Sequence, residues 1–344
     1  MKNLSLLFVG IVFLTITSCR KDDIVTKSTI LEPKEIFICG TGWENGRVVP
    51  RLWIENNFFY NHVYNYENEG NGGRADDIAF LGNDIYTVGS IYNSDGSSYR
   101  HVVWKNSTII TELTNIGFSS PFSIAVNENT KDIYVVGLEQ LPGEWAKVKI
   151  WKNGIKNSLS DNYIVMPFDI EIKNNDIYVV GCLFQDKIDI AVIWKNGVPT
   201  YLTDGKNNAV ATSITIIDND IYVAGTEENS SNNRIAKYWK NGIATSLTDG
   251  AFDATAATIV VDKKDVYVGG SEYNLNGKEV AKYWKNGVPK ILSNGIEHGG
   301  IKSSVIANNI FYSIGYNNVS ANLWYGNNTQ FSSSSSYFSS IIVR

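Results

Sequence analysis

Histidine side chains are the first candidates for catalysis or metal binding in this chain. Its three histidines, His62, His101 and His298, lie far apart in the sequence, and none belongs to an HExxH or CxxC pattern. Zinc sites are recognised by such closely spaced ligands. We therefore expect no metal and no cofactor, and we assign no catalytic residue.

Carboxylates leave one catalytic class open. They recur in segments that the fold predicted below places on one face, at Glu44, Glu67, Glu69, Asp95, Glu139, Glu144, Glu227, Glu228, Asp253, Glu272 and Glu297. Two converging carboxylates can hydrolyse a glycosidic bond. No spacing selects a pair, and surface carboxylates are usually solvated. The alternative function is therefore a polysaccharide hydrolase or lyase with carboxylates near the mouth of a channel.

The charge balance argues against one class of partner. The 344 residues include 30 Lys and Arg against 35 Asp and Glu, a net charge of −5. Proteins that neutralise phosphate backbones need clustered positive charge, so we expect no nucleic-acid partner. A hydrophobic content of 43% provides enough apolar surface for a stable core, which favours a folded chain over a disordered one.

The N-terminal segment predicts export and lipid attachment. Lys2 precedes the apolar run LSLLFVGIVFL, which is short for a membrane span and typical of a signal peptide. The following Ile16-Thr17-Ser18-Cys19 resembles the lipobox of bacterial lipoproteins. That resemblance implies cleavage of residues 1–18, acylation of Cys19 and a tether over residues 19–34. The alternative is an ordinary secretory signal followed by an incidental cysteine. We expect an outer-membrane lipid anchor as the only membrane contact, on the periplasmic or the cell-surface side.

One phrase recurs seven times after residue 35: a β-branched run, a polar pair, I-Y-V-x-G, a variable stretch, x-W-K-N-G and an apolar strand. Its glycines are Gly40, Gly89, Gly137, Gly181, Gly225, Gly269 and Gly315, and its tryptophans are Trp53, Trp104, Trp151, Trp194, Trp239, Trp284 and Trp324. A period of about 40–50 residues with four short strands is typical of a β-propeller blade. We predict an all-β, seven-bladed β-propeller over residues 35–344, with four antiparallel strands per blade.

Turn residues support this division into strands. Between third and fourth strands lie Asn-Gly pairs typical of type I′ hairpins, at Asn153-Gly154, Asn196-Gly197, Asn241-Gly242 and Asn286-Gly287. Between first and second strands we expect turns at Asn83-Asp84, Lys131-Asp132, Asn175-Asp176, Asn219-Asp220, Lys264-Asp265 and Asn308-Asn309. Residues 36–40 read as a second strand and residues 339–343 as a first strand, so the two termini should share one blade and close the ring.

The repeat resembles the kelch class, because a strand that ends in glycine precedes a strand with Tyr or Trp. The Gly-Gly doublet of that class occurs only at Gly269-Gly270, and the Trp-Asp ending of WD40 repeats is absent. We therefore expect a kelch-like propeller. Propellers host many unrelated functions, so the resemblance implies a fold and no activity.

Positions shared by all blades are expected to serve packing. A small polar residue opens each inner strand: Asp77, Ser123, Asp169, Ser213, Thr258, Ser304 and Ser340. We expect this ring to bind backbone N–H groups, with a cation site at its two carboxylates as the alternative. Cys39 and Cys182 occupy different repeat positions, and we expect buried thiols there rather than a disulfide.

Functional residues should depart from the repeat. The second-to-third and fourth-to-first connections vary in length and share one face of a propeller, called here the long-loop face, opposite the two-residue turns. Trp43 and Trp145 are out of register, and we expect both in loops on that face. The candidate ligand-binding residues are Trp43, Trp145, Tyr92, Tyr99, Tyr273 and His298.

Exposed aromatic side chains can stack on sugars or anchor a protein, whereas packing of the two tryptophans against their own blades is the alternative. We predict a monomeric, non-catalytic propeller that binds a glycan or a protein through the long-loop face. Besides the enzyme considered above, a structural role in outer-membrane assembly is the other alternative.

Overall fold

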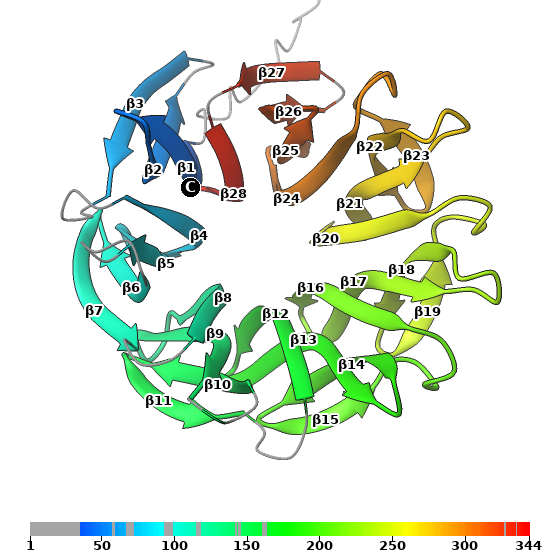
Figure 1. Cartoon of the computed structure of the whole chain (residues 1–344), viewed down its shortest axis with the longest axis horizontal. Helices are drawn as coiled ribbons and strands as arrows, with labels where there is room; N and C mark the ends of the chain where they lie inside the picture. Colours follow the sequence, from blue (N-terminus) through cyan, green and yellow to red (C-terminus); the bar gives the residue numbers. More distant parts are fainter. Residues whose placement is uncertain are drawn as a thin grey trace, which may run out of the picture. The chain divides into compact units, whose positions relative to one another are not determined.

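A computed structural model describes residues 35–344, apart from residues 57–58, 67–71, 93–98, 115–117, 142, 144–145, 160–163, 327 and 335. The described residues form seven four-stranded antiparallel sheets around a central axis (Figure 1). The predicted all-β, seven-bladed propeller is confirmed. No helix in this part of the chain is long and apolar enough to span a membrane.

Six blades follow the chain in order, each from inner to outer strand. They comprise β4 (Gly73–Leu81), β5 (Asp84–Tyr92), β6 (Tyr99–Lys105) and β7 (Thr108–Thr114); β8 (Phe118–Asn127), β9 (Asp132–Gln140), β10 (Lys147–Lys152) and β11 (Ile155–Ser158); β12 (Ile164–Lys173), β13 (Asp176–Gln185), β14 (Ile188–Lys195) and β15 (Val198–Tyr201); β16 (Ala209–Ile217), β17 (Asp220–Glu228), β18 (Arg234–Lys240) and β19 (Ile243–Ser246); β20 (Ala254–Asp262), β21 (Asp265–Tyr273), β22 (Glu279–Lys285) and β23 (Val288–Ile291); and β24 (Gly299–Ala307), β25 (Ile310–Asn317), β26 (Ser320–Tyr325) and β27 (Asn328–Ser333).

The seventh blade joins both ends of the propeller, as predicted. Its inner strand β28 (Ser336–Val343) pairs with β1 (Ile36–Glu44), which is followed by β2 (Arg47–Asn56) and β3 (Phe59–Asn65) (Figure 1). Glu35 and Arg344 exchange two backbone hydrogen bonds of 3.0 Å. The Arg344 guanidinium also lies 2.8 Å from the Glu35 carboxylate and 5.4 Å from the centre of the Phe37 ring. These contacts pair the two ends and remove the open sheet edges that a broken ring would leave.

Apolar side chains on the facing surfaces of neighbouring sheets form the core. Each repeat tryptophan is buried, and Trp194 packs with Val136 and Ile150 of the preceding blade. Cys39 and Cys182 are buried free thiols in different blades, as expected. Because a single sheet of this size cannot cover both of its faces, the blades stabilise one another.

The polar residues that recur in the repeat form a four-residue cluster of Asp, Tyr, Lys and Asn side chains. In the blade β12–β15, the Lys195 ammonium lies 2.7 Å from the Asp176 carboxylate and 5.3 Å from the centre of the Tyr178 ring. The Asn196 side-chain oxygen accepts the Ile177 N–H at 2.8 Å, and its amide donates to Asp176 at 2.7 Å. The same arrangement occurs at Asp84/Tyr86/Lys105/Asn106, Asp132/Tyr134/Lys152/Asn153, Asp220/Tyr222/Lys240/Asn241 and Asp265/Tyr267/Lys285/Asn286.

Five of the six predicted first-to-second turns need correction, whereas Asn308-Asn309 lies between β24 and β25 as predicted. The aspartates that we placed inside those turns instead begin the second strands, at Asp84, Asp132, Asp176, Asp220 and Asp265, because each binds a lysine and an asparagine of the third strand's end. The type I′ prediction for the Asn-Gly pairs is confirmed, since both residues of each pair have positive φ.

The repeat glycine is required by a β-bulge in the inner strand. Opposite Gly225, the chain inserts an extra residue between Ala211 and Ser213 of β16. This insertion brings the Val210 carbonyl oxygen within 2.0 Å of the position that a Cβ at Gly225 would occupy. No side chain fits there, so glycine is needed.

The position of the bulge shows that the repeat glycine of the blade β20–β23 was assigned to the wrong residue. Gly270, and not Gly269, pairs with Ala256 before the bulge, and its Cβ would lie 1.9 Å from the Thr255 carbonyl oxygen. A Cβ at Gly269 would instead meet the Thr258 and Ile301 side chains at 2.8 and 2.9 Å. The sequence assignment was shifted by one residue because the doublet offers two glycines.

We predict that Gly270→Ala lowers the free energy of unfolding by about 2–4 kcal/mol, because the new methyl group meets backbone that cannot rotate away. Gly269→Ala is the matched control, and it should cost less because its neighbours are side-chain atoms. Urea denaturation of both variants measures the difference. Equal losses would contradict the bulge as the reason for the glycine.

Candidate functional site

Three of the predicted aromatic residues lie at strand ends on the long-loop face. Trp43 is the next-to-last residue of β1 and pairs with Val48 of β2, so it belongs to a strand and not to a loop as predicted. Its side chain is 53% exposed. Tyr92 and Tyr99 face each other across β5 and β6 and are 39% and 36% exposed. Packing of Trp43 against its own blade is therefore incomplete.

Gly72 brings these aromatic residues onto neighbouring parts of two blades. Its carbonyl accepts the Tyr92 N–H at 3.2 Å. A Cβ on Gly72, which has φ of +85°, would lie 2.6 Å from the Val48 carbonyl oxygen and 3.3 Å from the Tyr92 ring. The hairpin that carries Trp43 and the ring of Tyr92 therefore both lie close to this glycine.

Tyr337 was missed by the sequence analysis. It lies near the start of β28, pairs with Thr41 and is 59% exposed. Because residues two apart on a strand share a face, Tyr337 is a diagonal neighbour of Trp43. An aromatic residue that ends a serine run outside the repeat phrase was the available signal. We call Trp43, Tyr92, Tyr99 and Tyr337 the aromatic platform.

Tyr273 and His298 form a separate pair between other blades, with ring centres 6.0 Å apart. The His298 Nδ1 accepts the Glu279 N–H at 3.3 Å. Equivalent hydrogen bonds run from Asp189 N–H to Asn208 at 3.1 Å and from Arg234 N–H to Asp253 at 2.8 Å. His298 thus occupies a repeat position whose side chain accepts the N–H of the first residue of a third strand. A ligand-binding role for this pair stays a prediction.

Two other predicted residues, Trp145 and Cys19, lie outside the described residues. Binding at Trp145 and lipidation at Cys19 therefore stay predictions.

A ring of hydrogen bonds joins the inner strands around the central axis. Asp77 accepts the Ile124 N–H at 2.9 Å and the Ser123 hydroxyl at 2.7 Å, both from the next blade. The same hydroxyl lies 3.0 Å from Asp169, which in turn accepts the Ile214 N–H at 2.9 Å. The expectation that these side chains bind backbone N–H groups is confirmed.

Weaker contacts continue this ring through the other blades. They join Ile259 N–H to Ser213 at 3.4 Å, Thr258 to Ser304 at 3.0 Å, Ile341 N–H to Ser303 at 3.4 Å, and Ser340 to Asp77. The residue that follows the bulge in β24 is Ser303, so the predicted position at Ser304 was off by one. Every pair of adjacent blades is therefore bridged by a side chain at this level.

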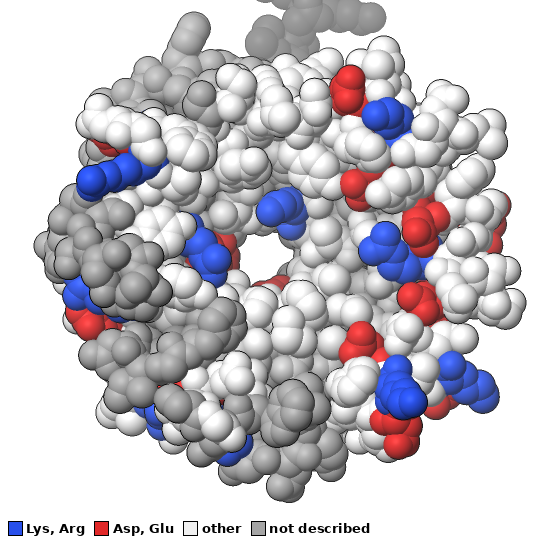
Figure 2. All heavy atoms as spheres, viewed as in Figure 1, with Lys and Arg blue, Asp and Glu red and all other residues white. Residues whose placement is uncertain are grey.

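Burial raises the pKa of several carboxyl groups near the axis. Loss of hydration raises the pKa of Asp169 to about 6, and the charge of Asp77 adds to the effect. Two residues further along β12, burial raises the pKa of Glu171 to about 8, and the charge of Asp169 also contributes. Burial likewise raises the pKa of Asp76 to about 6, although Arg74 lies 2.9 Å from its carboxylate. Figure 2 shows acidic and basic side chains beside the central opening.

Asp77 and Asp169 are the two carboxylates of the predicted alternative cation site. Asp77 and Asp169 are close, since one serine hydroxyl contacts both. Their oxygens, however, accept N–H groups of neighbouring strands, which ties them to the structure. Among the residues that the structure describes, no three His, Cys, Asp or Glu side chains are grouped as metal ligands.

No protein-family model matches the chain, and no curated protein is similar to it in sequence. Among solved structures, the β-propeller domain of the Trilobed protease from Pyrococcus furiosus is 15% identical, with a TM-score of 0.56, over 88% of this chain and 95% of that one. That domain is described as having an open velcro topology, whereas here β28 and β1 share a sheet.

Two peptidases are similar over part of their length. A Mycobacterium tuberculosis puromycin-hydrolyzing peptidase is 10% identical with a TM-score of 0.58, over 87% of this chain and 51% of that one. The Pyrococcus horikoshii acylaminoacyl peptidase is 14% identical with a TM-score of 0.54, over 86% of this chain and 50% of that one. This chain spans about half the length of both peptidases. Identities this low show the propeller fold alone.

We predict that Glu171→Gln stabilises the protein at alkaline pH. Because the folded pKa of Glu171 is about 8, above its ordinary value of 4.5, its favourable contribution is complete below pH 4.5 and is lost as the pH rises through 8. Glutamine removes the charge and keeps an oxygen that can accept the Ile216 N–H. The free energy of unfolding should rise by about 1–2 kcal/mol at pH 9 and change little at pH 4.5.

Urea denaturation at both pH values tests this prediction. Glu128→Gln is the control, because that carboxylate is exposed, and it should show no such pH dependence. A Glu171→Gln variant that is less stable than the parent at pH 9 would contradict the assignment of a buried, destabilising charge.

Proposed function

We propose that this chain is a lipid-anchored, non-catalytic binding propeller of the outer membrane, and that its ligand is a glycan held on the aromatic platform. The exposure of Trp43, Tyr92 and Tyr99 at strand ends of two adjacent blades carries this proposal. Aromatic side chains have large apolar faces that gain free energy when a sugar ring covers them. Because they project from strands, their positions are fixed before the ligand binds.

A protein ligand on the same platform is the second candidate, since exposed Trp and Tyr are also typical anchors of protein interfaces. The hydrolase alternative ranks lower because several of its candidate carboxylates are ion-paired: Glu139 with Lys156, Glu227 with Lys237 and Glu272 with Lys282. The peptidase activities named for the similar structures are not proposed for this chain, because fold similarity at this level carries no activity.

The lipid anchor at Cys19 rests on the resemblance to a lipobox. The first described residue, Glu35, contacts Arg344, whose guanidinium also donates to the Asn83 carbonyl in a two-residue turn. The chain therefore enters the propeller on the side opposite the long-loop face. An anchor preceding that point would leave the platform accessible, in the periplasm or at the cell surface.

The Trp43→Ala/Tyr92→Ala variant should lose glycan binding. A screen of the purified protein on a glycan array and on soluble polysaccharides identifies the ligand, and the variant should bind it at least about tenfold more weakly, as expected for removal of aromatic anchors. Tyr201→Ala is the matched control because Tyr201 is 49% exposed on a different blade, in β15.

Equal losses in the control and the platform variant would place the ligand elsewhere. Absence of any glycan ligand would overturn the first candidate, and crosslinking to membrane proteins on intact cells would then test the second.

Cys19→Ser should abolish lipid attachment. With Cys19 intact, the protein expressed in a Gram-negative host should incorporate labelled palmitate and partition into the detergent phase of Triton X-114. The variant should incorporate no label and partition into the aqueous phase. Incorporation of label into Cys19→Ser would contradict the predicted site of acylation.

A further inference from the structure

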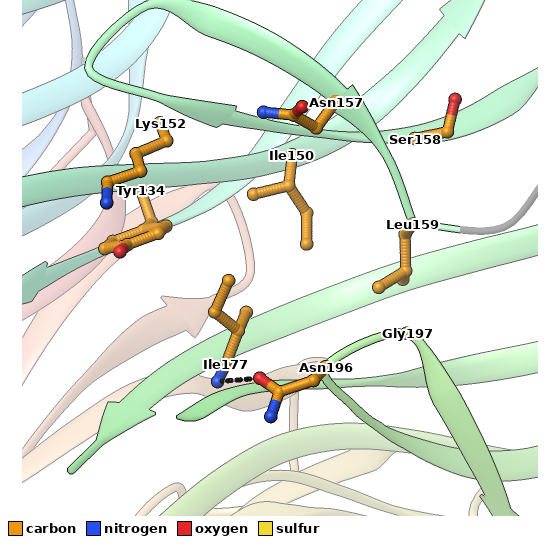
Figure 3. Close-up of a pocket in the computed structure, with 9 residues that line it drawn as sticks. All are labelled: Tyr134, Ile150, Lys152, Asn157, Ser158, Leu159, Ile177, Asn196 and Gly197. Atoms are coloured by element: carbon orange, nitrogen blue, oxygen red, sulfur yellow. Dashed lines mark hydrogen bonds between the residues drawn. The ribbon is translucent and has the colours of Figure 1, made fainter. Parts of the chain in front are cut away.

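A cleft of about 350 Å³ opens between the blades β8–β11 and β12–β15 (Figure 3). Ile150, Leu159 and Ile177 point into it, with the Tyr134 ring at one side. Its polar rim consists of Lys152, Asn157, Ser158, Asn196 and Gly197. The cleft includes the two-residue turn between β14 and β15, so it is distinct from the aromatic platform. Its volume is within the range of small-molecule sites.

The same space is filled by aromatic rings at another interface of the ring. Between the blades β20–β23 and β24–β27, Tyr283 and Phe311 have ring centres 4.5 Å apart, and Phe311 stacks on Tyr267 at 5.6 Å. These three rings occupy the repeat positions of Ile150, Ile177 and Tyr134 respectively. The cleft therefore keeps the equivalent of Tyr267 but has aliphatic side chains in place of two rings.

The hydrogen bond of the repeat tryptophan sets this interface apart. The indole N–H of Trp151 donates to the Leu113 carbonyl at 3.0 Å. The equivalent N–H of Trp194, which is fully buried, has no acceptor among the residues that the structure describes. Its repeat-equivalent acceptor is the carbonyl of Leu159, which instead approaches Gly197, 3.2 Å from the position of a Cβ. The backbone at Leu159 thus departs from the repeat, whereas the aliphatic pair recurs at the interface of the blades β12–β15 and β16–β19, as Ile193 and Ile221.

The charge of the lining selects a neutral ligand. Lys152, its one titratable cation among the described lining residues, lies 2.8 Å from Asp132 and 5.5 Å from the centre of the Tyr134 ring. That charge is neutralised within the protein. Asn157 and Ser158 at the rim can donate to or accept from a hydroxyl group.

We propose that this cleft binds a small neutral aromatic molecule of the phenol class. Its ring takes the place that Tyr283 and Phe311 occupy in the other interface, between the Tyr134 ring and the methyl groups of Ile150 and Ile177, and its hydroxyl reaches the rim. A concave apolar site with a few polar groups at its edge is typical of small-molecule binding. This site is independent of the glycan proposed for the aromatic platform.

The test uses p-cresol, which has the ring and hydroxyl of a tyrosine side chain, and the full-length chain labelled at isoleucine methyl groups. The methyl resonances of Ile150 and Ile177 should shift saturably, with a dissociation constant of about 1 mM, and those of Ile259 and Ile314, buried in other blades, should not. Cyclohexanol, of similar size but not aromatic, should bind at least about tenfold more weakly.

Two variants close the cleft with the residues found at the other interface. Ile150→Tyr should weaken p-cresol binding at least tenfold, and Ile177→Phe serves the same purpose if the first variant does not fold. Ile193→Tyr, at the same repeat position one blade later, is the matched control and should bind normally.

Absence of shifts at 20 mM p-cresol, or shifts that persist in the closed variants, would overturn the proposal. Equal binding of cyclohexanol would overturn its aromatic part. Tighter binding of N-acetyltyrosine amide than of p-cresol would overturn the assignment to a free small molecule in favour of a peptide side chain.

Discussion

The seven inner strands form no backbone ladder with one another, because each belongs to a separate sheet. Their mutual positions depend on the β-bulge that each of them carries. The extra residue moves the following side chain toward the next blade, where Asp77 and Asp169 accept strand N–H groups. It also presses a carbonyl against the second strand, as at Gly225. The repeat glycine and the polar ring are thus two consequences of one backbone irregularity.

The two faces of the propeller are under different constraints. On one face, the Asp-Tyr-Lys-Asn clusters fix five nearly identical hairpin ends, and each lysine is paired with a carboxylate and a tyrosine ring. On the long-loop face, the connections differ in length and sequence, so side chains such as Trp43 project without a repeat partner. A rigid frame with one variable face is the usual arrangement for binding sites on such scaffolds. The cleft at Ile150 and Ile177 is an exception, because its lining includes Asn196 and Gly197 of a two-residue turn on the opposite face.

Partly buried acids show that the frame is not optimised for stability alone. Glu171 and Asp169 are on one strand and interact unfavourably when both are charged, and burial raises the pKa of each. They are nevertheless useful to the fold because each can accept an N–H from β16 while no backbone partner is available. Serine performs the same task in other blades without carrying a charge.

The sequence by itself determined the architecture. A repeat of four short strands, with its tryptophans in register and with Asn-Gly turns, is compatible with a β-propeller alone. The strands at 36–40 and 339–343 lacked partners within their own repeats, so they had to pair with each other and close the ring. This worked because repeat packing uses local patterns that recur seven times. The candidate site was less accessible to sequence. Trp43, Tyr92 and Tyr99 could be named as departures from the repeat, but their grouping around Gly72 depends on contacts between two neighbouring blades.

Tertiary structure alone decided the rest. It placed Tyr337 beside Trp43 by pairing the last strand with the first, and it showed His298 at a repeat position that supports a strand. It also resolved Gly270 from Gly269 and Ser303 from Ser304, since the bulge decides which residue of each pair lies next to it. The cleft at Ile150 and Ile177 became visible only when the two blades were placed face to face, because its volume depends on side chains from both sheets and not on either repeat alone.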